Sequence, residues 1–222
     1  MRVLIFAAGV ITDPQGVRQY QQVDDIIIAA DGGARHCQAL GIQPHTVIGD
    51  FDSLTPSELD TLEQAGVQIM RYPMRKDLTD LELALHYAAQ LGAQEILVFG
   101  ALGLRWDQTL ANLLLLAVPA LACRQVRLID GSQEIFLVCN QGETHITGQP
   151  GDTVSLIPIG GDAFGITTQG LEYPLNNETL IFAASRGVSN VLLGLKASVS
   201  LNQGLLVCVV IHHTFTSETE KK

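Results

Sequence analysis

The sequence predicts a two-domain protein, with an α/β doubly wound domain at residues 1–140 and an all-β sandwich domain at residues 141–216. In the first part, short apolar runs alternate with amphipathic helical segments, as parallel strands covered by helices do. After about residue 140, short strand-like runs separated by turns replace that alternation. The chain has 222 residues, of which 47% are hydrophobic, so it is long enough to bury a substantial core. Residues 217–222 are expected to be a frayed tail.

The strands of the first domain are predicted from continuous apolar runs, which indicate burial on both faces of a sheet. They are expected at residues 3–8, 26–30, 46–48, 67–72, 95–99 and 125–130. Strands that alternate with helices in this way form a Rossmann-like sheet with right-handed crossovers. The carboxyl ends of its strands then lie at one edge, where open α/β sheets bind ligands.

The helices between these strands are predicted from their start and stop signals. A helix over 34–40 ends at Gly41, and Thr55-Pro56-Ser57-Glu58 is a capping box that opens a helix to about residue 65. Thr79 and Glu82 form a second capping box, whose helix ends at Gly92. A last helix is expected from about residue 108 to 117, before Pro119.

The strands of the second domain are short and separated by turn signals such as Gly160-Gly161-Asp162. Helical periodicity is absent there, which favours a sandwich or a flattened barrel. The strands are expected at residues 143–146, 153–158, 163–168, 179–183, 190–195, 197–201 and 205–211.

Acidic side chains follow most of the strands in the first domain. Asp50 and Asp52 come directly after a buried strand, and residues two apart on an extended backbone point to the same side. Two converging carboxylates repel each other unless a cation lies between them, and Mg²⁺ prefers such oxygen ligands. The alternative is an Asp-rich turn without a metal. The other acids at the predicted edge are Asp31, Asp77, Asp80 and Asp107.

Each further acid also has a structural interpretation. Asp31-Gly32-Gly33 joins a strand to a helix, which can place an anion at the helix N-terminus or be a simple tight turn. Asp80 favours the helix dipole and Asp107 can be an N-cap. Arg105 could bind phosphate, because its guanidinium matches phosphate oxygens. The crowding of these acids at one edge favours Mg²⁺ with a polyphosphate.

Composition excludes several classes of protein. A net charge of −10 argues against sequence-independent binding to nucleic acid, which needs a basic face. The four cysteines are far apart and the six histidines form no HExxH pattern, so a zinc site is not expected. The chain shows no signal-peptide pattern, and its longest apolar run, 110–123, is too short for a bilayer. We therefore expect a cytoplasmic protein without a membrane anchor.

The motifs at these positions resemble those of the thiamine pyrophosphokinase family, and the resemblance covers most of the chain. In the first domain, the matching segments are Asp31-Gly32-Gly33, Gly49-Asp50-Phe51-Asp52-Ser53, Asp77-Leu78-Thr79-Asp80, Gly103-Leu104-Arg105-Trp106-Asp107-Gln108 and Asn112. In the second, they are Gly170-Leu171-Glu172-Tyr173-Pro174-Leu175 and Ser185-Arg186-Gly187-Val188-Ser189-Asn190. One departure is Ala7-Ala8-Gly9-Val10, where many relatives have a Gly-Gly or Asn-Gly turn.

The resemblance implies pyrophosphate transfer from ATP to the hydroxyl of thiamine, with Mg²⁺, in a homodimer whose active sites lie between subunits. It implies Asp50, Asp52 and Asp80 as metal ligands, with these three, Arg105 and Asp107 as catalytic residues. It implies contacts to ATP and its phosphates from Asp31, Gly32, Gly33, Asp77, Thr79, Gln108 and Asn112. It implies Tyr173, Ser189 and Asn190 as thiamine contacts.

Two other functions fit the same acids. A Mg²⁺-dependent nucleotide phosphohydrolase uses paired aspartates equally well and would release phosphate without an acceptor. A catalytically silent protein that binds nucleotide or thiamine would keep the pocket without turnover. The number of carboxylates argues against it, because binding alone does not need them.

Overall fold

The structure is a computed structural model, and it describes residues 1–74, 77–103, 105–122, 124–140 and 142–213. The expected tail at 217–222 lies outside these residues. The chain forms two compact units, Met1–Gly131 and Ser132–Lys222, so they divide at Gly131 and not at the expected residue 140. The reason is strand β7 (Gln133–Cys139), which pairs with β13 (Gln203–Ile211) and thereby belongs to the second unit. This strand was not predicted, although an Asp-Gly turn before an apolar run is its signal.

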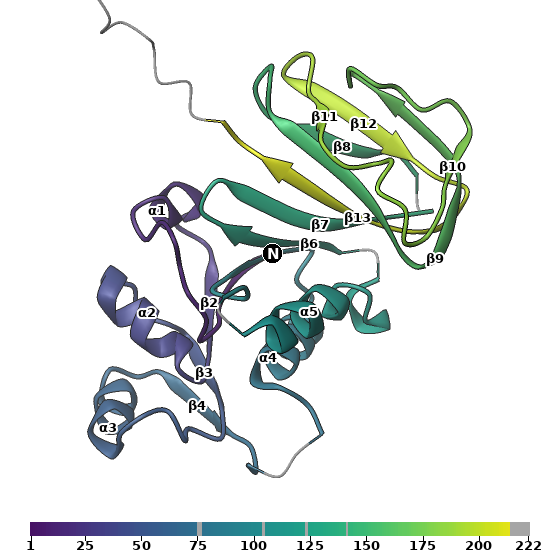
Figure 1. Ribbon diagram of the computed structural model, residues 1–222. Helices are drawn as coiled ribbons and strands as arrows, with labels where there is room; N and C mark the ends of the chain where they lie inside the picture. Colours follow the sequence, from purple (N-terminus) through teal and green to yellow (C-terminus); the bar gives the residue numbers. More distant parts are fainter. Residues whose placement is uncertain (75–76, 104, 123, 141, 214–222) are drawn as a thin grey trace, which may run out of the picture. The chain divides into compact units, whose positions relative to one another are not determined.

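The first unit contains a parallel sheet in the order β4-β3-β2-β1-β5-β6. Figure 1 shows helices α2 and α4 on opposite sides of β2 and β3. All six strands were expected from the sequence, with ends that differ by a few residues. Their bounds are β1 Arg2–Phe6, β2 Ile26–Ala30, β3 Thr46–Gly49, β4 Gln68–Arg71, β5 Glu95–Phe99 and β6 Gln125–Asp130.

These strands are continuous apolar runs because both faces of the sheet are covered. In β1, Leu4 and Phe6 point to one face and pack into the same cluster as Ala34 and Cys37 of α2. Their neighbour Ile5 has no solvent exposure either, although its side chain points to the other face. A sheet buried on both faces leaves only its strand ends and loops open to ligands.

The helices begin and end largely where the capping signals predicted. Helix α3 has both hydrogen bonds of the Thr55–Glu58 capping box, and α2 ends at Gly41 in the left-handed conformation (φ 67°). The short helix α1 was not predicted. The bounds are α1 Val17–Tyr20, α2 Gly33–Leu40, α3 Pro56–Gln64, α4 Asp80–Gln90, α5 Trp106–Leu115 and the 3₁₀ turn η1 Pro119–Leu121. No helix in the described part of the chain is both long and apolar enough to span a bilayer.

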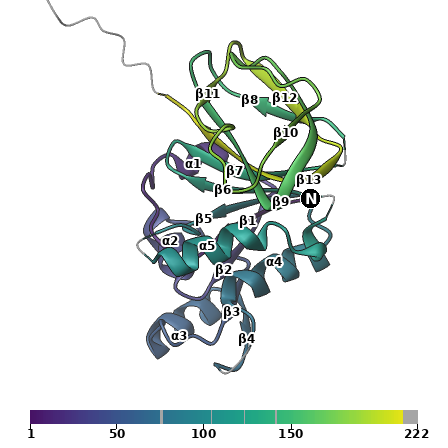
Figure 2. The same ribbon diagram turned by 45° about the vertical axis from the view of Figure 1, so that its right-hand side comes forward.

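The second unit consists of antiparallel strands in the order β7-β13-β9-β12-β8, with β10 and β11 paired to β9 (Figure 2). The two strands expected at 153–158 and 163–168 are a single strand, β9. Gly160 and Gly161 have φ angles of 72° and 148°, which bend the strand without ending it. The remaining bounds are β8 Thr144–Thr147, β9 Thr153–Gln169, β10 Glu178–Leu180, β11 Asn190–Val191 and β12 Lys196–Ser200.

Candidate active site

A cleft of about 930 Å³ opens at the carboxyl ends of the parallel strands of the first unit. The chain builds β2, β3 and β4 on one side of β1 and then crosses to β5 on the other side. Open α/β sheets bind ligands where strand order reverses in this way. Among the residues expected at the site, the cleft is lined by Asp31, Asp50, Asp52, Thr79, Asp80, Arg105, Gln108 and Asn112.

Two loops meet across this reversal, one after β1 and one after β5. The Gly9 N–H donates to the Gly100 carbonyl at 2.9 Å, and the Val10 N–H donates to the Leu102 carbonyl at 3.2 Å. A Cβ on Gly9 would lie 2.4 Å from the Gly100 oxygen, so only glycine fits there. The backbone of both loops is therefore held in place where the loops line the cleft.

Three carboxylates come together beside these loops. Asp31 follows β2, and Asp50 and Asp52 follow β3; one oxygen of each lies within 4.8 Å of the others. Gly49 makes this possible, because its Cα faces Asp31 where a Cβ would lie 3.0 Å from the Asp31 Cβ. The resemblance implied Asp50, Asp52 and Asp80 as metal ligands and Asp31 as a contact to ATP, whereas the fold groups Asp31 with Asp50 and Asp52.

Asp31 is held in an unusual conformation. Its backbone is left-handed (φ 44°), its side chain is buried, and its Oδ2 accepts a hydrogen bond from Ser53 Oγ. Its Oδ1 is buried without a hydrogen-bond partner in the described structure. A buried carboxylate oxygen costs stability when it is unpaired, and a cation would supply the missing partner. The donor set of three carboxylates therefore fits Mg²⁺.

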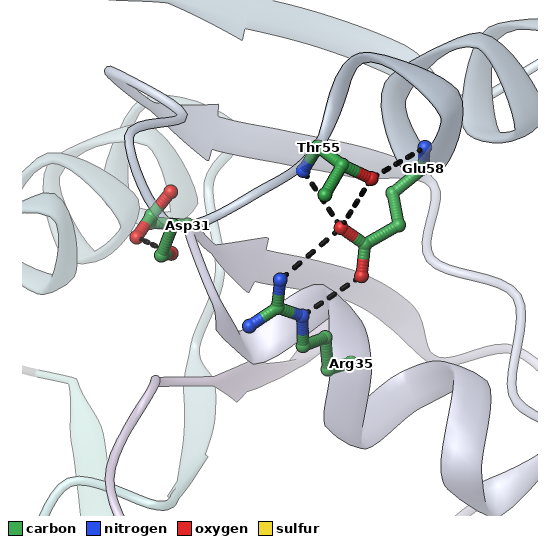
Figure 3. A network of polar contacts seen from close by, with 5 residues as sticks. Asp31, Arg35, Thr55 and Glu58 are labelled. Atoms are coloured by element: carbon green, nitrogen blue, oxygen red, sulfur yellow. Dashed lines mark hydrogen bonds and ion pairs between the residues drawn. The ribbon is translucent and has the colours of Figure 1, made fainter.

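A polar network fixes the elements that follow these acids (Figure 3). Arg35 of α2 makes two hydrogen bonds to the Glu58 carboxylate, at 2.8 and 3.1 Å, and the same carboxylate accepts the Thr55 N–H at 2.7 Å. The hydrogen bond from Arg35, with those from Thr55, lowers the pKa of Glu58 to about 2. Because α2 follows the Asp31 loop and α3 follows the Asp50–Asp52 loop, this network ties the two acidic loops together.

The residues expected around helix α4 are divided between the cleft and the surface. Thr79 is the N-cap of α4, and its Oγ1 accepts the Glu82 N–H at 3.2 Å. Asp80 stands in the first turn and lines the cleft, outside the group of three carboxylates. Asp77 is exposed and does not line the cleft. The neighbouring basic pair, Arg75-Lys76, lies outside the described residues.

The loop after β5 places an arginine at the cleft. Arg105 and Asp107 form an ion pair with a shortest distance of 2.5 Å, and the hydrogen bond from Arg105 lowers the pKa of Asp107. The helix begins at Trp106, so Asp107 lies in its first turn and the N-cap interpretation is wrong. Asn112 is buried, and its Nδ2 donates to the Ala101 carbonyl at 2.6 Å. This hydrogen bond ties the loop after β5 to helix α5.

Gly32 and Gly33 were expected to contact the nucleotide, and neither lines the cleft. Gly33 has a packing role instead, because a Cβ there would lie 1.9 Å from the Phe6 carbonyl oxygen. This close approach lets α2 start directly against β1. Helix packing therefore accounts for Gly33 without a ligand.

The three residues expected to contact thiamine lie together in the second unit. Tyr173 is 64% exposed, and its backbone N–H and carbonyl both bond to the side-chain amide of Asn190, at 3.0 and 2.8 Å. Ser189 has a left-handed backbone (φ 64°), and its N–H donates to Ser155 Oγ. Asn190 thus holds the loop that presents the Tyr173 ring.

Comparisons with known proteins identify relatives across both units. The family model for the thiamin pyrophosphokinase catalytic domain matches residues 17–128, and the model for the thiamin pyrophosphokinase vitamin B1 binding domain matches residues 142–206. Thiamine pyrophosphokinase of Bacillus subtilis is 32% identical over 191 residues, which cover 86% of this chain and 89% of that protein. Thiamine pyrophosphokinase 1 of Arabidopsis thaliana is 29% identical, covering 84% and 78%.

Solved structures agree with this result. The crystal structure of the Bacillus subtilis thiamine pyrophosphokinase has a TM-score of 0.86 at 29% identity, covering 96% of this chain and 100% of that one. The thiamin pyrophosphokinase of Candida albicans has a TM-score of 0.79 at 19% identity, covering 96% and 90%, and at that identity it shows the fold alone.

Proposed function

Because the chain belongs to the thiamine pyrophosphokinase family, we propose that it transfers the pyrophosphoryl group of ATP to the hydroxyl of thiamine. The products are thiamine diphosphate and AMP. The observation that supports this most directly is the group formed by Asp31, Asp50 and Asp52 at the reversal of strand order. A polyphosphate with its cation is the ligand that such a group suits.

Asp31, Asp50 and Asp52 would hold Mg²⁺, and Asp80, which lines the same cleft, would add a fourth carboxylate to the site. When bound, the cation neutralises charge on the phosphate oxygens and makes the β-phosphorus more electrophilic. The unpartnered Oδ1 of Asp31 supports this assignment, because an acid that served only to close a turn would have both oxygens satisfied.

In the reaction, the thiamine hydroxyl oxygen forms a bond to the β-phosphorus. The bond from that phosphorus to the oxygen shared with the α-phosphate breaks, and AMP leaves with the electron pair. An aspartate of the cleft accepts the hydroxyl proton. Arg105, which lines the cleft, stabilises charge on the phosphate oxygens, and its ion pair with Asp107 sets its direction. We assign contacts with ATP to Gln108 and Asn112, which lie on α5 together with Asp107. Thr79, the N-cap of α4, positions Asp80.

The second unit supplies the acceptor site. Tyr173 would stack on an aromatic ring of thiamine, since its ring is exposed while its backbone is held by Asn190. We assign Ser189 and Asn190 to the same site. We also propose that the first unit is a Rossmann-like doubly wound domain, with helices on both faces of its sheet, and that the second is a β-sandwich.

We propose that the protein is a homodimer with active sites between subunits. Exposed apolar side chains in the second unit support an interface, with Leu193 and Leu195 each more than 60% exposed. Sedimentation should give twice the chain mass of 23.9 kDa. A monomer would contradict the dimer and leave the reaction itself unaffected.

The experiment that tests the function is product analysis with ATP, MgCl₂ and thiamine. Thiamine diphosphate and AMP should form in equal amounts, and EDTA should abolish both. ADP with thiamine monophosphate would overturn the attack on the β-phosphorus. Phosphate release without thiamine would favour a phosphohydrolase. Binding of ATP without any product would favour a silent binding protein.

A further inference from the structure

We propose that His36 is a positioning residue for ATP, because it holds the loop after β1 in the shape that the cleft requires. The inference deepens the proposed function and rests on it. His36 lies in α2, is half-buried, and lines the same cleft as the acids. Its Nε2 lies 2.7 Å from the carbonyl oxygen of Gly9.

The direction of this hydrogen bond follows from its partner. A carbonyl oxygen can only accept, so the Nε2 of His36 must carry the proton and donate it. On its other side, the Gly9 N–H donates to the Gly100 carbonyl. Gly9 is therefore held at both of its backbone polar groups, by α2 on one side and by the β5 loop on the other.

Gly9 lines the cleft that we assign to ATP. The loop at residues 7–11 forms a wall of the cleft next to the point at which strand order reverses. A side chain at Gly9 would collide with the carbonyl oxygens of Gly100 and Leu102. The loop therefore cannot shift toward them if the hydrogen bond from His36 is lost. Without His36, the Gly9 carbonyl loses its partner and can turn toward the phosphates, whose negative charge it would repel.

The test compares His36→Ala with His36→Gln, whose side-chain amide can also donate to a carbonyl. The Kd for ATP with Mg²⁺, measured by calorimetry, should rise about threefold to tenfold in His36→Ala. The KM for ATP should rise with it, while the KM for thiamine stays unchanged. His36→Gln should recover most of the loss.

His45→Ala is the matched control. The His45 Nδ1 accepts the Ile27 N–H at 3.0 Å, so it also bonds to the backbone of this unit, but at the start of β2 and away from the cleft. Its loss should lower the melting temperature and leave the Kd for ATP unchanged. A wild-type Kd for ATP in a folded His36→Ala protein would overturn the inference.

These experiments distinguish a failure of the proposed function from a failure of the role of His36. If wild-type protein binds ATP but forms no thiamine diphosphate, the proposed function fails and the Kd values still decide the role of His36. If wild-type protein turns over and His36→Ala binds ATP equally well, only the role of His36 is lost. An equal rise in the KM for both substrates would indicate a general structural effect and would also contradict the inference.

Discussion

At the scale of single residues, the proposed cation site predicts what loss of a single carboxylate charge should do. Asp50→Asn should lower kcat at least about a hundredfold, because it removes one of the carboxylates that we propose to hold the charge-stabilising cation. Asp60→Asn is the control, since Asp60 is exposed on α3 and the substitution removes the same charge outside the cleft. A kcat for Asp50→Asn near that of the wild type would remove Asp50 from the site.

Asp31→Asn removes the negative charge of this side chain and keeps its shape. Asparagine tolerates the left-handed backbone at this position and can still accept from Ser53, but it carries no charge. Without Mg²⁺, the variant should melt at or above the wild-type temperature, because a buried negative charge with one unpartnered oxygen is gone. The stabilisation that Mg²⁺ gives the wild type should be smaller in the variant. Thermal melts with and without MgCl₂ check this, and an equal Mg²⁺ shift in both proteins would contradict the role of Asp31.

Tyr173→Ala should raise the KM for thiamine about threefold to tenfold, while the KM for ATP stays unchanged. The expected loss is that of an aromatic contact, so Tyr173→Phe should behave as the wild type does. Phe182→Ala removes another exposed ring of the second unit and serves as the control. An unchanged KM for thiamine in Tyr173→Ala would exclude this residue from the acceptor site.

At the scale of elements, the start of α3 links local stability to the acidic loops. Thr55→Ala removes the cap of α3 and one partner of Glu58, and it should lower the free energy of unfolding by about 1 kcal/mol. Thr61→Ala is the control, because Thr61 Oγ1 donates to the Ser57 carbonyl inside the helix and takes no part in the capping box. Chemical denaturation measures both. Equal effects of the two substitutions would show that the capping box adds no stability of its own.

At the scale of the whole molecule, pH should act through His212, which follows β13. His212 lies between Glu134, at 3.6 Å, and Asp152, at 2.8 Å, and these carboxylates raise its pKa to about 9. Burial alone would raise the pKa of Asp152, but hydrogen bonds from the backbone of Gln149, from His212 and from the backbone of His213 together lower it. His212 and Asp152 are therefore both ionised at neutral pH.

Because the folded pKa of His212 is above its unfolded value, the stability it contributes is fully present below about pH 6.5. That stability is lost as pH rises through about 9. The free energy of unfolding of the wild type should therefore fall across this range more steeply than that of His212→Gln. His145→Gln, an exposed histidine on β8, should follow the wild-type curve. Parallel curves for wild type and His212→Gln would contradict the assignment.

The sequence by itself determined most of the elements and the edge of the sheet at which the acids gather. Apolar runs and caps predicted the six parallel strands, the ends of α2 and α3, and the edge where Asp50 and Asp52 lie, because these signals act within a few residues. The sequence also predicted the family. It failed where a strand needs a distant partner: β7 belongs with β13, and β9 continues through two glycines because β13 and β12 pair along it.

Only the tertiary structure decided which side chains meet. Asp31 joins Asp50 and Asp52 because β2 and β3 are neighbours in a parallel sheet and Gly49 leaves room for it. His36 reaches Gly9 because α2 packs against β1 through Gly33, across 27 residues of sequence. Local patterns report on propensity and burial, whereas contacts between distant loops depend on strand order and on close approaches of the backbone. Those are properties of the folded chain.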